Sequence, residues 1–136
     1  MASPHVTVTS SDGTTLAWAD GVTLSVVQVR QAVTADVGPG SIPGRPETVV
    51  SLQVSNGSNR AIDLFQVLVS MPYDTAPPRL AAHVYDEGTY EFAALVPPGG
   101  SAQATYGFAV PAGRSADLTV DLDGNHTIGT LQGVAG

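Results

Sequence analysis

The chain has 136 residues, a length that fits one domain (1–136) with a single core. It contains no cysteine, which excludes disulfides, thiolate metal sites and cysteine nucleophiles. Five basic residues, all arginine, stand against twelve acidic ones, and the formal net charge is −7. This balance disfavours nucleic acid and anionic lipid as partners, and the absence of an apolar run of about 18 residues argues against membrane insertion.

The first elements are predicted to be short strands. Val6 and Val8 alternate with polar residues, as in a half-buried strand, and residues 14–19 follow as a second candidate after the turn residues 10–13. Residues 1–20 are therefore expected to form an N-terminal hairpin. The only tryptophan, Trp18, lies in this hairpin.

Residues 22–33 predict the first long strand. Val22, Leu24 and Val26 share one parity, whereas the apolar residues from Val27 onward follow the other. A change of parity inside one strand predicts a β-bulge at the junction of Val26 and Val27.

The middle of the chain predicts a loop, a strand, a turn and a returning strand. Residues 36–46 contain three glycines and three prolines and are expected to be a loop. Residues 47–55 alternate as a strand, and Asn56-Gly57 is a strong turn signal. Residues 61–71 are apolar on both parities, which predicts a returning strand that is either covered on both faces or bulged.

Short strands are also expected in the last third of the chain. The candidate strands are residues 80–85, 89–96, 102–110, 118–122 and 126–131. The last of these is predicted to be an edge strand, and residues 132–136 are expected to fray. Seven to nine strands, with no sustained helical period, predict an all-β fold, an antiparallel β-sandwich. A jelly roll or a closed barrel is the alternative.

The chain resembles secreted immunoglobulin-like domains of unknown function from Gram-positive bacteria, found in actinobacterial exported proteins and lipoproteins. The resemblance covers about residues 20–122 and rests on residues 22–33, 49–58 with 62–64, and 96–102 running into 106–111. It implies an immunoglobulin-like sandwich placed outside the cytoplasm, in the extracellular space or the cell envelope. It brings no catalytic motif. Residues 1–5 do not read as a signal peptide, so a cytoplasmic placement stays open.

Tyr106 follows a Pro-Gly corner and precedes Phe108 by two residues. In immunoglobulin-type sandwiches a tyrosine in this place bonds back to the backbone of the preceding connection, and the second position is buried. The alternative is that Tyr106 is simply an inward-facing aromatic residue. Both interpretations give it a structural role.

Two segments match the N-glycosylation pattern: Asn56-Gly57-Ser58 and Asn125-His126-Thr127. In a bacterial protein they are interpreted as turns, and in a secreted eukaryotic protein as sugar sites.

No metal site or cofactor is predicted. The three histidines, His5, His83 and His126, lie far apart in the sequence. A weak calcium candidate consists of Asp121, Asp123 and Asn125, with Asp117 as an outer ligand, but a hairpin turn explains these residues without a metal.

No nucleophile motif is found, and enzymatic activity is not expected. Aromatic and basic residues gather between Tyr73 and Phe92, on segments bounded by prolines, as in a protein interface. The alternative is that Phe92 and one or two of the tyrosines belong to the core and the others are scattered. The candidate binding surface is Tyr73, Arg79, His83, Tyr85 and Tyr90. It predicts a non-catalytic module that recognises a protein or an envelope glycan. A carbohydrate-binding module with stacking tyrosines, or a structural spacer that assembles through edge strands, is the alternative. The protein is expected to be a monomer or a weak homo-oligomer.

Overall fold

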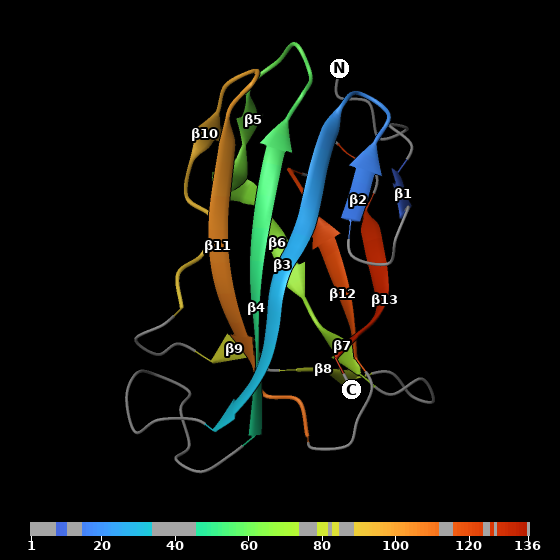
Figure 1. Ribbon diagram of the computed structural model, residues 1–136, viewed down its shortest axis with the longest axis vertical. Coiled ribbons are helices and arrows are strands. Elements are labelled where there is room, and N and C mark those ends of the chain that lie inside the picture. Colours follow the sequence, from blue (N-terminus) through green and yellow to red (C-terminus); the bar gives the residue numbers. More distant parts are fainter. Residues whose placement is uncertain are drawn as a thin grey trace.

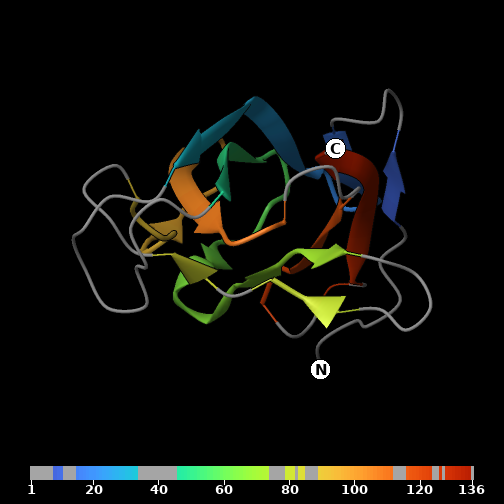
Figure 2. The ribbon, with the colours of Figure 1, turned by 90° about the horizontal axis from the view of Figure 1, so that it is seen from below.

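The computed structural model describes residues 8–10, 15–33, 46–73, 79–81, 83–84, 89–111, 116–123, 126 and 128–135. These residues form an all-β sandwich, whose two main sheets face each other across one core (Figures 1 and 2). In the part of the chain that the structure describes, no helix is long and apolar enough to cross a membrane.

The first sheet has six strands, all paired antiparallel, in the order β1-β2-β3-β4-β11-β9. Its strands are β1 (Val8–Ser10), β2 (Thr15–Trp18), β3 (Val22–Val33), β4 (Pro46–Asn56), β11 (Ser101–Phe108) and β9 (His83–Val84).

The second sheet has the order β13-β12-β7-β8, and β6 also pairs with β12. Its strands are β6 (Leu68–Ser70), β7 (Pro72–Tyr73), β8 (Arg79–Leu80), β12 (Ala116–Asp121) and β13 (Gly129–Ala135). A third, two-stranded ladder joins β5 (Ile62–Asp63) to β10 (Leu95–Val96). Among the described residues, eight of the strands have three or more residues.

The core follows from the alternation of apolar side chains along each strand. On β4, Val50, Leu52 and Val54 are buried, whereas the residues between them, Ser51 and Gln53, are only half-buried. On β12, Leu118 and Val120 supply the facing layer. Each sheet thus contributes one row of inward side chains to a common interior.

The predicted bulge in β3 is confirmed. Val26 pairs with Leu52, but the next pair is Gln28 with Ser51, so that one residue of β3 has no counterpart on β4. The extra residue is Val27, which is 61% exposed. The change of parity in the sequence therefore reflects one inserted residue.

The prediction of one returning strand over residues 61–71 is wrong. The segment is divided into β5, a 3-10 helix (Leu64–Gln66) and β6. Asp63 caps this helix, because its side-chain Oδ1 accepts the N–H of Phe65 at 3.0 Å. The helical turn interrupts the alternation of inward and outward side chains along the segment. Leu64 is therefore buried, whereas Leu68 is exposed. The segment also does not return along β4, since β5 pairs with β10.

Two further predictions need correction. Residues 132–136 were expected to fray, but β13 continues to Ala135, which pairs with Ala116. β13 does form an edge of its sheet, as expected. Residues 89–96 do not form one strand, because Tyr90 makes an isolated bridge and β10 begins only at Leu95.

Three turns meet at one end of the sandwich, and we call residues 19–21, 56–60 and 97–100 the turn cluster. The backbone of Asn56 bonds to the corner before β11: its N–H donates to Gly100 O at 2.9 Å, and its carbonyl accepts the N–H of Gly99 at 2.7 Å. Gly57 N–H donates to Gly21 O at 3.1 Å. These contacts join three connections that are far apart in the sequence.

The Asn56 side chain is buried at the centre of the turn cluster, with 2% exposure. Its Nδ2 donates to the carbonyls of Arg60 and Val96, at 2.6 and 3.0 Å. Its Oδ1 accepts from both the N–H and the hydroxyl of Ser58, at 3.0 and 2.6 Å. All hydrogen-bonding groups of this amide are thus used within the fold. The Asn56-Gly57-Ser58 segment, which matches the N-glycosylation pattern, is a turn in the structure.

Candidate functional site

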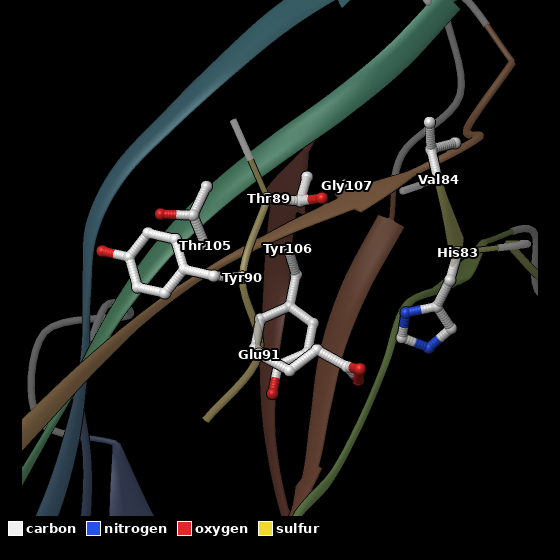
Figure 3. Close-up of a pocket in the computed structure, with 8 residues that line it drawn as sticks. All are labelled: His83, Val84, Thr89, Tyr90, Glu91, Thr105, Tyr106 and Gly107. Carbon is white, nitrogen blue, oxygen red and sulfur yellow. The ribbon is translucent and has the colours of Figure 1, made fainter. Parts of the chain in front are cut away.

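A pocket of about 180 Å³ lies at the β9 edge of the first sheet (Figure 3). The residues that line it come from β9, from the segment before β10 and from β11. They are His83, Val84, Thr89, Tyr90, Glu91, Thr105, Tyr106 and Gly107.

Two separate pairings along β11 hold the walls in place. β9 pairs with the end of β11, Val84 opposite Gly107 and His83 opposite Phe108. Closer to the start of β11, Tyr90 and Thr105 exchange two backbone hydrogen bonds, at 2.9 and 2.8 Å. The backbones of both walls are thereby tied to the same strand.

Gly107, in the lining of the pocket, has no space for a side chain. A Cβ at this position would lie 2.9 Å from Val84 O and 3.0 Å from Glu47 Oε2, so no larger residue fits without displacing them. Glu47, at the start of β4, is only 2% exposed. Its carboxyl group therefore lies close to Gly107, on the side to which a Cβ would point.

Aromatic rings back the pocket. The hydroxyl of Tyr106 accepts the backbone N–H of Phe92 at 3.2 Å. Phe92 precedes β10, so this bond reaches further upstream than the connection of residues 97–100 to which the sequence suggested a bond. Phe108 is buried, as expected for its position, and its ring stacks on Tyr106 at a centroid distance of 6.2 Å. The ring of His83 packs on Phe108 at 4.8 Å. These contacts restrict the orientation of the histidine.

The side chain of Tyr90, unlike that of Tyr106, is 55% exposed. Figure 3 shows it beside Thr105 at one side of the pocket, with His83 at the other side of Tyr106. Glu91, the next residue, is also exposed and lines the same pocket. The pocket thus combines an exposed aromatic ring, hydroxyl groups, a carboxylate and an imidazole.

The structure divides the binding surface that the sequence suggested. His83 and Tyr90 line the pocket together. Tyr73 and Arg79 pair with each other between β7 and β8, in the other sheet. Tyr85 lies outside the described residues.

Six of the residues that line the pocket were not singled out by the sequence as binding residues: Val84, Thr89, Glu91, Thr105, Tyr106 and Gly107. Thr105 and Gly107 read as the polar positions of an alternating strand, and nothing local marks Glu47 as buried. Only the pairing of β11 with β9 and β4 brings these residues together.

A second polar cluster surrounds His126, near the turn cluster. Its Nε2 lies 2.6 Å from Asp20 Oδ2 and its Nδ1 lies 2.9 Å from Asp123 Oδ1. The ring also meets the edge of Trp18 at a centroid distance of 6.1 Å. We call these contacts the His126 clamp, because they join the β2–β3 turn to the segment after β12.

The pKa of His126 is raised in this clamp. Burial by itself lowers the pKa, but the hydrogen bonds to Asp123 and Asp20 and the negative charges of both carboxylates outweigh it. Two carboxylates on the two ring nitrogens favour the imidazolium form, in which both nitrogens donate. The cluster therefore acts as an ion-paired tie between two parts of the sandwich.

The same contacts bear on the calcium candidate. Asp123 Oδ1 accepts from the backbone N–H of His126 at 3.1 Å as well as contacting its ring. Asp121 lies on β12, and Asn125 is outside the described residues. Within the described ranges, no three His, Cys, Asp or Glu side chains converge in a geometry suited to a metal ion.

No protein-family model and no curated protein matches this sequence. Among solved structures, the chain is similar to an uncharacterized β-sandwich protein from Clostridium difficile 630, with 12% sequence identity and a TM-score of 0.45. The alignment covers 93% of this chain and 90% of that one. The fold and the pocket together define the class of protein: an all-β sandwich domain with a small pocket of mixed polar and apolar lining at a sheet edge.

Proposed function

We propose that this protein is a non-catalytic, immunoglobulin-like binding module that acts outside the cytoplasm and recognises a protein or a cell-envelope partner. The observation that carries the proposal is the pocket, where an exposed tyrosine, Tyr90, stands on a rigid backbone beside polar side chains. Exposed aromatic rings on rigid segments are the usual anchors of recognition surfaces. The extracytoplasmic placement is supported by the resemblance to exported domains over residues 20–122.

The size of the pocket favours recognition of a small group on a larger partner. Pockets that enclose whole small-molecule ligands usually have roughly 300–1,000 Å³, whereas this one has about 180 Å³. A volume on the order of 150 Å³ holds a single benzene-sized ring. One amino-acid side chain or one sugar ring therefore fills the pocket.

A carbohydrate-binding module is the second candidate, and Tyr90 favours it as well. Its exposed ring offers a stacking surface, while Thr89, Glu91 and Thr105 line the same pocket with hydroxyl and carboxylate groups. Sugar hydroxyls bond to such groups. The two candidates share the site and differ in the partner.

The proposal is tested by probing the purified chain on a peptide array and on a glycan array in parallel. Binding is then remeasured with Tyr90→Ala and with Phe65→Ala, which removes an aromatic side chain that is exposed on the 3-10 helix, away from the pocket. We expect Tyr90→Ala to abolish binding and Phe65→Ala to preserve it. A ligand that binds both variants equally, or no ligand on either array, would contradict the proposed site.

A further inference from the structure

We infer that the pocket receives a positively charged side chain, an arginine or a lysine, presented by a basic protein partner. This inference rests on the proposed function and specifies the chemistry of its site.

The charges around the pocket favour a cation. Glu91 places an exposed carboxylate on its wall. The residues that line it include no arginine, and the sequence has no lysine. The whole chain carries a net charge of −7, which attracts basic partners at long range.

The walls of the pocket suit a guanidinium or ammonium group. Arginine stacks on tyrosine rings, and a cation over an aromatic face gains about 0.5–1 kcal/mol at exposed sites. Tyr90 offers such a face, and its backbone is already fixed by two hydrogen bonds to Thr105. A backbone that is fixed before binding loses little further conformational freedom when the ligand arrives.

Hydroxyl and carboxyl oxygens supply acceptors for the N–H groups of the cation. The Thr105 hydroxyl lies 3.2 Å from the Ser51 hydroxyl, which orients it on β11. Thr89 and Glu91 line the same pocket from the segment before β10. A planar guanidinium has five donors and no acceptor, so this set of oxygens matches it better than it matches a neutral apolar side chain.

The inference is tested by NMR titration of the 15N-labelled protein with acetyl-Gly-Arg-Gly-amide. Its counterpart in which citrulline replaces arginine has nearly the same shape without the charge. We expect the arginine peptide to shift the amide signals of Tyr90, Thr105 and Gly107 and to bind at least about fivefold more tightly than the citrulline peptide. Equal binding of the two peptides, or shifts confined to other residues, would overturn the inference.

Two variants test whether the carboxylate of Glu91 in the pocket, and not the overall negative charge of the protein, attracts the arginine peptide. Glu91→Gln removes one exposed carboxylate from the pocket and is expected to weaken the arginine peptide about two- to fivefold. Asp117→Asn removes the same charge from β12, in the other sheet, and should leave binding unchanged. An equal effect of both variants would mean that only the overall charge attracts the peptide, which contradicts a cation pocket.

The outcome for neutral ligands separates this inference from the proposed function. If an uncharged sugar or peptide shifts the same three amide signals and the arginine peptide does not, the pocket is a binding site but not a cation site. If array ligands bind equally well to the Tyr90→Ala variant, the proposed function itself fails at this site.

Discussion

The turn cluster and the pocket are both built from polar residues, but they use them in different ways. In the turn cluster, the amide of Asn56 is buried and bonds to Ser58, Arg60 and Val96 of its own chain. At the pocket, Tyr90 and Glu91 project from a fixed backbone towards solvent. The comparison shows that polar side chains hold the chain together at the turn cluster, whereas at the pocket they face a hollow that a partner can fill.

The largest effect is expected from Asn56→Ala. This change leaves buried donors and acceptors of the turn cluster without their partner, and we expect it to lower the free energy of unfolding by about 3 kcal/mol. Urea denaturation followed by circular dichroism measures the change. Asn59→Ala, at an exposed neighbouring position, is the control and should alter stability by less than about 0.5 kcal/mol. Similar losses in both variants would argue against the structural role of Asn56.

Gly21→Ala should have the next largest effect. Gly21 has a φ of 103°, and a Cβ there would lie 2.7 Å from Gly57 O. We expect a loss of about 2–3 kcal/mol from the combined strain and contact. Gly99→Ala is the matched control, since Gly99 has a φ of 81° but no atom near its Cβ position, and should cost about 1 kcal/mol. Thermal unfolding of both variants separates the two contributions. Equal shifts would mean that the close contact with Gly57 adds nothing.

Tyr106→Phe tests whether the backing of the pocket depends on one hydrogen bond. It removes the acceptor of the Phe92 N–H, which is buried, and should lower stability by about 1–2 kcal/mol. Because the aromatic ring remains, packing on Phe108 is preserved. Chemical denaturation gives the loss, and hydrogen exchange at the Phe92 amide should accelerate. An unchanged exchange rate would contradict this role of the tyrosine.

The smallest effect, and the only one that depends on pH, is expected at His126. Because its pKa is raised in the folded state, the clamp stabilises fully below the ordinary value of 6.5 and loses this stabilisation as the pH rises through the raised value. We expect His126→Gln to lower stability by about 1 kcal/mol at pH 5.5 and by less at pH 9. Unfolding free energies of both proteins across this range provide the measurement. A loss that does not change with pH would contradict the protonated clamp.

The β-bulge and the burial of Phe108 were predictable because each leaves a local mark. An inserted residue changes the parity of apolar positions at Val26 and Val27, and a tyrosine two residues before a buried position follows a known corner. The 3-10 helix at Leu64–Gln66 was missed because a three-residue helix inside an apolar run has no period of its own.

The pocket was only half predictable. His83 and Tyr90 attract attention as residue types, but they come together because both flank β11, and strand order is not encoded in any short segment. Glu47 illustrates the limit, because it reads as an exposed residue at the start of a strand. Its burial depends on the close approach of Gly107 from a strand that follows about fifty residues later.

The buried amide of Asn56 has a practical consequence for producing the protein. Both hydrogens of Nδ2 are donated inside the fold, so an oligosaccharide on this nitrogen would replace one of them and would have no room in the folded turn. Oligosaccharyltransferase modifies such sequons on the nascent chain, before folding protects them. Secretion from yeast or mammalian cells should therefore yield misfolded, glycosylated material. Bacterial hosts that lack this enzyme do not glycosylate Asn56 and should yield the folded protein.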